Sequence, residues 1–169
     1  SPPPEAEWQR AADALREVAR FARDHGVDLG LEPVNRYESH LVNTCEQALR
    51  LCEMVGEPNV KVHLDTYHMN IEEKDFYAAA IRAGDRLVHL HLSENDRGIP
   101  GTGLVRWDDL FRALAAVGYR GMAAIESFAD MAVPGDVWAW RAPAPDTETL
   151  VRQGSRFIRG LMQRYGLAA

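Results

Sequence analysis

The apolar and polar positions of this chain follow two periods, one typical of helices and one typical of strands. Apolar residues recur at helical spacing from about residue 7 to residue 25, and Gly26 follows as a helix end. Four shorter runs then show strand-like patterns, and a helical stretch comes after each of them. The predicted strands span residues 27–32, 60–65, 87–92 and 122–126, and the helices after them span 44–56, 75–83, 107–117 and 146–165.

Strands that alternate with helices predict a parallel sheet, which is either doubly wound or rolled into a barrel. The two faces of the strands distinguish these folds. In residues 60–65 one face is Val, Val, Leu and the other is Lys, His, Asp, while in residues 88–92 one face is aliphatic and the other holds two histidines. Doubly wound strands are buried by helices on both faces and read as continuous aliphatic runs. The pattern therefore favours an α/β fold of the (β/α)8 TIM-barrel type.

Composition restricts the function classes. The 169 residues, 46% of them apolar, suit one folded domain, and the net charge of −6 argues against binding to nucleic acid. No apolar run approaches the roughly 20 residues that cross a bilayer, and the first residues do not resemble a signal peptide. We therefore expect a cytoplasmic protein with no membrane or nucleic-acid partner. Cys45 and Cys52 lack the spacing of a redox or zinc motif and are interpreted as buried thiols.

Functional groups gather where the predicted strands end. Each alone is more simply a solitary polar residue, but four on the face opposite the aliphatic residues favour one site at the carboxyl end of a barrel. Three carboxylates that lie together repel one another unless a cation lies between them. Oxygen donors with one imidazole suit Mn²⁺, Mg²⁺ or Co²⁺, with two positions open for a substrate. The predicted ligands are Glu32, Asp65, His91 and Glu126.

Further polar residues lie in the predicted loops after the strands, where substrates are usually bound. They are Glu38, His68, Glu94 and Arg97, although solvated or capping roles suit His68 and Arg97 equally well. His89 is interpreted as a core histidine one layer below His91, and Lys61 and His63 as polar packing in the interior. The glycine-rich segment 98–103 lacks the Lys-Ser/Thr of a phosphate-binding loop and is interpreted as a turn.

Four segments resemble the D-tagatose, D-psicose (allulose) and L-ribulose 3-epimerases of the xylose-isomerase-like barrel superfamily. They are residues 31–38, 64–73, 89–97 and 125–128, and LDTYHMNIEE at 64–73 is the most specific of them. Ser127 departs from the family, which often has Pro after the last ligand. The resemblance implies that 1–169 is the C-terminal half of a barrel, a leading helix plus the last four βα units. We therefore expect a native product of roughly 270 to 300 residues, and unpaired sheet edges that favour a homo-oligomer or self-association.

The resemblance also implies roles for individual residues. Glu32 and Glu126 would serve as the acid/base pair as well as ligands of one divalent ion, Mn²⁺ in first place and Co²⁺ or Mg²⁺ otherwise. Glu38, His68 and Arg97 would match the substrate-binding positions. The implied reaction is epimerisation of a free ketose at C3 through a metal-stabilised enediolate.

Other activities remain open at this stage. The alternatives are an aldose-ketose or hydroxypyruvate-type isomerase with the same ligands, an inosose dehydratase or phosphodiesterase of the superfamily, and a non-catalytic metal- or sugar-binding fragment.

Overall fold

The structure is a computed structural model that describes residues 2–128 and 141–167. Its four strands form one parallel sheet in the order β1-β2-β3-β4, and helices connect them. This confirms the predicted fold class and the order of its elements. The elements are α1 (Glu5–Asp24), β1 (Leu29–Leu31), α2 (Cys45–Val55), β2 (Val60–Asp65), α3 (Thr66–Glu72), α4 (Phe76–Ala83), a 3₁₀ turn (Gly84–Arg86), β3 (Leu87–Leu92), α5 (Trp107–Ala116), β4 (Met122–Ile125) and α6 (Thr147–Tyr165).

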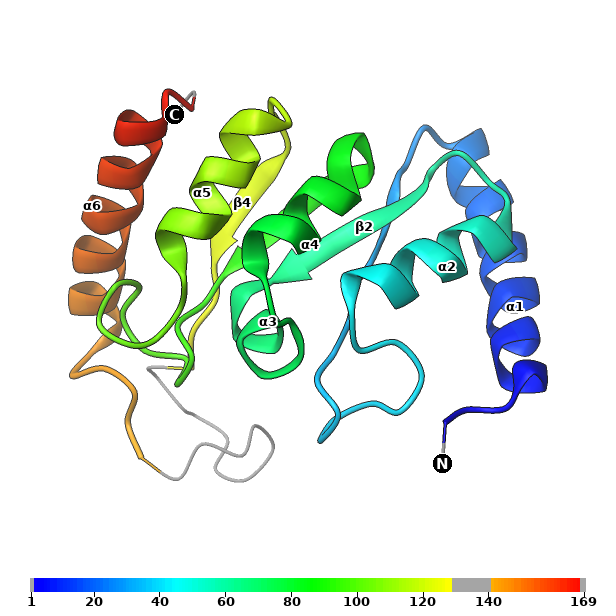
Figure 1. The fold of residues 1–169 in the computed structure, drawn as a ribbon, viewed down its shortest axis with the longest axis horizontal. Coiled ribbons are helices and arrows are strands. Elements are labelled where there is room, and N and C mark those ends of the chain that lie inside the picture. Colours follow the sequence, from blue (N-terminus) through cyan, green and yellow to red (C-terminus); the bar gives the residue numbers. More distant parts are fainter. Residues whose placement is uncertain (1, 129–140, 168–169) are drawn as a thin grey trace.

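The long helices lie along one face of the sheet, with α1 and α6 at its two ends (Figure 1). The strand residues on that face are aliphatic, and Val62, Leu64 and Leu90 are completely buried there. Both cysteines are buried and free in α2, as predicted. Helices cover one side of the sheet, as they do in the wall of a barrel, and the opposite face carries the polar strand residues.

Capping side chains explain where the helices begin. Thr44 accepts a hydrogen bond from the backbone N–H of Gln47, and the Gln47 side chain accepts one from Thr44, which completes the predicted capping box. Asp75 and Asp146 cap α4 and α6 by accepting hydrogen bonds from the backbone N–H groups of Ala78 and Thr149. Gly56 ends α2 in the left-handed conformation with φ of 72°, which favours glycine.

The structure differs from the sequence prediction at three strand or helix boundaries. It contains α3, a seven-residue helix that the periodicity did not predict, and the Asp65 side chain caps it by accepting from the Tyr67 N–H at 2.7 Å. The predicted first strand is shorter, so Glu32 follows β1 instead of ending it. Glu126 likewise follows β4, although its N–H still bonds to Leu92 O at 3.4 Å.

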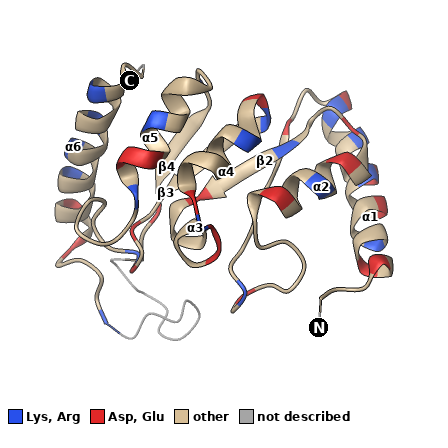
Figure 2. Ribbon diagram, in the orientation of Figure 1, with Lys and Arg blue, Asp and Glu red and all other residues tan. Residues whose placement is uncertain are grey.

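Lys61 is not packed in the interior as predicted. Its Nζ lies 2.6 Å from Asp28 Oδ2 at the start of the sheet, so the charged end reaches a partner near solvent while the stem covers the polar face. Elsewhere the outer surfaces of α1 and α2 mix acidic and basic residues (Figure 2). None of the helices in the described ranges combines the length and apolar character that spanning a bilayer requires.

Candidate active site

The predicted metal ligands come together at the carboxyl ends of the strands. The sheet register places Asp65 of β2 beside His91 of β3, and the residues after β1 and β4 flank this pair. His91 Nδ1 lies 3.4 Å from Glu126 Oε2, 3.7 Å from Glu32 Oε1 and 4.0 Å from Asp65 Oδ2. Three carboxylates therefore surround one imidazole nitrogen, on the edge of the sheet where the loops after the strands gather (Figure 1).

The donor atoms of this cluster fit a divalent cation. His91 Nδ1 is buried and has no hydrogen-bond partner among the described residues, although a buried ring nitrogen normally has one. Oxygens of Asp65 and Glu126 lie within 4.8 Å of it and of each other. Carboxylate oxygens with one neutral imidazole suit Mn²⁺, Co²⁺ or Mg²⁺.

Burial and mutual repulsion set the charges of the cluster. Burial, followed by the charge of Glu126, raises the pKa of Glu32 to about 7. Burial also raises the pKa of Asp65, which is 1% exposed, although Arg97 opposes that shift. Burial acts on Glu126 in the same direction, but hydrogen bonds with Asp65 and Arg97 outweigh it and lower its pKa. Because burial lowers the pKa of His91, its imidazole is neutral and can donate a lone pair.

Arg97 lies inside the carboxylate cluster. Its Nη1 bonds to Asp65 Oδ2 at 2.6 Å and to Glu126 Oε2 at 2.5 Å, and its guanidinium lies 3.9 Å from the centre of the Tyr67 ring. The residue is only 7% exposed, so the alternative of a solvated role is wrong. Its backbone adopts φ of 62°, which is uncommon for a residue other than glycine. These contacts make Arg97 the buried positive charge of the site.

Asn35 links two of the predicted substrate-binding residues, and the sequence analysis did not select it. Its side-chain amide nitrogen lies 2.7 Å from Glu38 Oε1 and 2.9 Å from His68 Nδ1. His68 is buried, whereas Glu38 is exposed beside the site. Burial, followed by the charge of Arg97, lowers the pKa of His68 to about 4. The sequence offered one signal for Asn35, namely its position three residues before Glu38, a predicted substrate-binding residue.

Glu94 is a structural residue of the loop after β3. It is completely buried, and its carboxylate accepts from the backbone N–H groups of Gly101 and Val105 at 2.8 and 2.9 Å and from the Trp107 indole at 3.0 Å. The predicted glycine-rich turn is thus folded around a buried carboxylate. Since the N–H of Arg97 donates to Glu94 O, the same loop also holds the guanidinium in place.

His63 and His89 lie one layer below His91 on the polar face. The ring centres of His63 and His91 are 4.2 Å apart, and those of His63 and His89 are 4.7 Å apart. His63 is buried as predicted, whereas His89 is only half-buried and is a less complete core residue than expected. Burial, together with its two histidine neighbours, lowers the pKa of His63 to about 3, so its imidazole is neutral.

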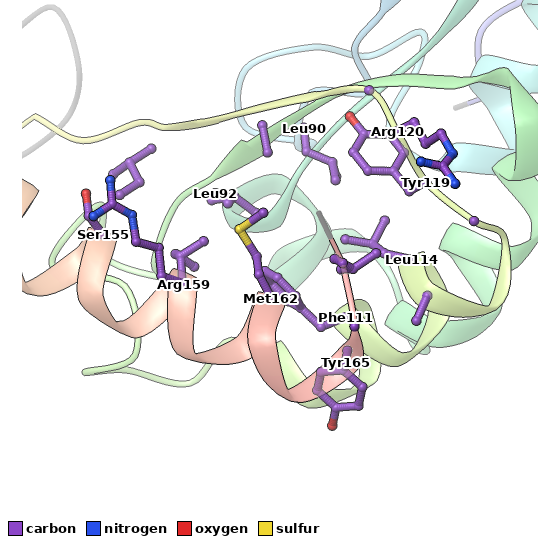
Figure 3. Close-up of a pocket in the computed structure, with 18 of the residues that line it drawn as sticks. Leu90, Leu92, Phe111, Leu114, Tyr119, Arg120, Ser155, Arg159, Met162 and Tyr165 are labelled. Carbon is purple, nitrogen blue, oxygen red and sulfur yellow. The ribbon is translucent and has the colours of Figure 1, made fainter. Parts of the chain in front are cut away.

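A cavity of about 900 Å³ lies on the other side of the sheet, between α5, β4 and α6 (Figure 3). Its walls include Leu90, Leu92, Phe111, Ile125 and Met162, and none of the predicted site residues line it. Its polar lining residues include Tyr119, Arg120, Ser155 and Arg159, but the described residues that line it include no carboxylate or imidazole that could form a cluster of ionisable groups like the one beside His91. The carboxylate cluster is therefore the candidate active site.

The chain matches the model of the xylose isomerase-like TIM barrel family over residues 1–161 and belongs to that family. A D-psicose 3-epimerase of Enterocloster bolteae is 42% identical over 139 residues, which are 81% of this chain and 46% of that protein. A solved L-ribulose 3-epimerase is 37% identical with a TM-score of 0.93, over 98% of this chain and 57% of the other.

A second solved relative is the D-allulose 3-epimerase from Methylomonas sp. in complex with D-allulose. It is 36% identical with a TM-score of 0.89, over 95% of this chain and 57% of the other. These relatives confirm the family predicted from the four sequence segments. The chain spans about half the length of the curated relatives it matches.

Proposed function

We propose that this chain carries the cation-binding and proton-transferring part of a ketose 3-epimerase that acts on free ketoses. The observation that carries the proposal is the set of three carboxylates within 4.0 Å of His91 Nδ1. Further support comes from the names of its relatives, one of which was solved with D-allulose bound. The 1–169 segment would form the C-terminal half of the barrel.

Four residues of this chain would hold one divalent cation, with Mn²⁺ as first choice and Co²⁺ or Mg²⁺ as alternatives. They are Glu32, Asp65, His91 and Glu126. When bound, the cation would polarise the substrate carbonyl and stabilise the negative charge that develops beside it, a contribution of several kcal/mol.

Glu32 and Glu126 would transfer the protons. Epimerisation at C3 needs a base that removes the proton from one side of the carbon and an acid that returns one to the other side. These glutamates follow the first and last strands of the sheet, so they approach the cluster from different directions. Each can serve as base or acid, and the starting configuration at C3 decides which does so.

The remaining polar groups would orient the sugar. Arg97 presents N–H groups beside the carboxylates, His68 turns its Nε2 toward them, and Glu38 presents acceptor oxygens at the exposed rim. Hydroxyl and carbonyl oxygens of a ketose can accept from the first two residues and donate to the third. The buried guanidinium also limits the repulsion between carboxylates while the substrate binds.

Turnover of a free ketose in deuterated water tests the proposal with the full-length gene product. One solvent deuterium should appear at C3 of the product and none at C1, because the proton is exchanged only at the epimerised carbon. Exhaustive chelation should abolish turnover, and Mn²⁺ or Co²⁺ should restore it. Label at C1 or C2 would replace the proposal by an aldose-ketose isomerase, and cation binding without any turnover would indicate a non-catalytic binding protein.

A further inference from the structure

The amide of Asn35 has a defined orientation in the buried layer beside the site. The residue is 1% exposed and lies in the loop after β1. Its Oδ1 accepts from the backbone N–H of Tyr37 at 3.0 Å, so this end of the amide must be the oxygen. The other end is therefore the NH₂ group, whose two hydrogens serve Glu38 Oε1 and His68 Nδ1 at 2.7 and 2.9 Å.

His68 Nδ1 faces two N–H donors from the same residue. Besides the amide, the backbone N–H of Asn35 donates to it at 3.2 Å. A ring nitrogen that receives N–H donors must offer its lone pair, and in a neutral imidazole the proton then resides on the other nitrogen. That nitrogen, His68 Nε2, faces the carboxylate cluster: Asp65 Oδ2 lies 4.0 Å from it, and the guanidinium Nη2 of Arg97 lies 3.4 Å from it, which is longer than either donor contact at Nδ1.

Three groups of described residues have the spacing of a cation site, and the third is formed by histidines alone: His63, His89 and His91. The tautomer of His68 distinguishes the two groups that contain carboxylates, of which one is Asp65, His91 and Glu126 and the other is Glu32, Asp65 and His68. A protonated Nε2 has no lone pair and cannot be a ligand, which removes His68 from the second group. His91 Nδ1 has no partner among the described residues and keeps its lone pair available.

We infer that Asn35 is a positioning residue that holds His68 in the Nε2–H tautomer, so that His68 donates a hydrogen bond to a substrate oxygen instead of binding the cation. The substrate part of this inference rests on the proposed function. Through its second hydrogen, the same amide holds the Glu38 carboxylate at the rim of the site. One side chain therefore fixes an N–H donor and an acceptor on the same side of the substrate.

Long-range ¹H–¹⁵N correlation spectra of the full chain read the tautomer directly. We expect His68 to show the Nε2–H tautomer both after chelation and with diamagnetic Mg²⁺. Asn35→Asp replaces the NH₂ donor at 2.9 Å by a charged acceptor, which is closer to Nδ1 than the remaining backbone N–H at 3.2 Å, so Nδ1 should gain a proton. Nδ1 protonated in the unmodified chain, or an unchanged Nε2–H tautomer in a folded Asn35→Asp variant, would overturn the inference.

Asn43→Ala is the matched control within the same loop. The Asn43 amide bonds to Val34 O and Ser39 O at 2.6 and 2.9 Å and does not bond to His68, so its loss loosens the loop while the tautomer is kept. A tautomer change as large in this variant as in Asn35→Ala would attribute the effect to loop disorder and refute the assignment to Asn35.

Kinetics of the full-length product give the second readout. Asn35→Ala should lower kcat/KM by about 10- to 100-fold, the usual effect of losing a group that orients a functional histidine, with bound cation retained. Asn43→Ala should retain most activity. Loss of the cation in Asn35→Ala, or unchanged kcat/KM, would contradict the inference. A product without epimerase activity but with the expected tautomer would refute only the proposed function.

Discussion

The two faces of the sheet contrast in chemistry, although the same strands form both. On the helix side, Val62, Leu64 and Leu90 are at most 1% exposed and pack against the helices. On the other side, His63 and Asp65 of β2 are buried beside other ionisable side chains. Burial lowers the pKa of His63 and raises the pKa of Asp65. Neighbouring residues of one strand thus serve stability and binding separately.

Most of the unpaired polar atoms lie near the site. Among the described residues, five buried side-chain atoms have no hydrogen-bond partner; three are His63 Nε2, His91 Nδ1 and Arg97 Nε, and the other two are Asn59 Oδ1 and Ser93 Oγ. Each such atom costs free energy that a hydrogen bond or a bound ion would recover. The helix side packs the hydrophobic core, whereas the polar face holds the groups of the candidate site.

Leu64→Ala should cause the largest loss of stability. The side chain is 1% exposed on the helix side, so its removal leaves a cavity and should lower the free energy of unfolding by about 2–5 kcal/mol. Urea denaturation of the full chain measures the loss. Val18→Ala, at an exposed position of α1, is the control and should change stability by less than about 0.5 kcal/mol. A loss below about 1 kcal/mol for Leu64→Ala would mean that this face is not a packed core.

Unlike Leu64→Ala, the substitutions Glu32→Gln and Glu126→Gln should affect activity more than stability. Each keeps the size of the side chain but removes a base and a ligand, so kcat of the full-length product should fall by at least about 10²-fold. Glu32→Gln should keep or increase stability, because the raised pKa of Glu32 means that its charge is unfavourable in the folded chain. Glu126→Gln should lower stability somewhat, because it removes a charge that pairs with Arg97. Glu46→Gln, on the exposed surface of α2, controls for the chemical change. Near-normal rates in both site variants would remove these glutamates from the mechanism.

The sequence predicted the division between faces because alternation along a strand is a local property. The side chains of Leu64 and Asp65, which are neighbours in the sequence, point to opposite faces of the sheet. The carboxyl ends of parallel strands meet at one edge of the sheet. These two rules were sufficient to predict from the sequence that four side chains lie close together: Glu32, Asp65, His91 and Glu126. The capping box at Thr44 is equally local and was also predicted correctly.

The missed features depend on contacts between distant parts of the chain. Asn35 contacts His68, 33 positions away, and Arg97 contacts Asp65, 32 positions away, so neither burial follows from local sequence. The helix α3 has seven residues and begins at the cap that Asp65 provides, which is too short for periodicity to reveal. Glu94 was selected from the sequence as a polar residue of a substrate-binding loop, whereas its carboxylate is buried and holds that loop together.

His63→Leu should have the smallest effect, a change in how the free energy of unfolding depends on pH. Burial, with His91 and His89 adding to it, lowers the pKa of His63 from 6.5 to about 3 in the folded chain. Between pH 6.5 and pH 3 the unfolded chain therefore binds a proton that the folded chain does not, so stability falls as pH falls through this window and is fully present above it.

His63→Leu removes that contribution. On going from pH 7.5 to pH 5 in the presence of a chelator, the unmodified chain should lose about 2 kcal/mol more of unfolding free energy than the variant. Urea denaturation at the two pH values measures this, and His40→Leu, at an exposed histidine, is the control. Equal losses in the unmodified chain and in His63→Leu would show that this imidazole is hydrated in the folded protein, and the contrast between the two faces would then be confined to the strand ends.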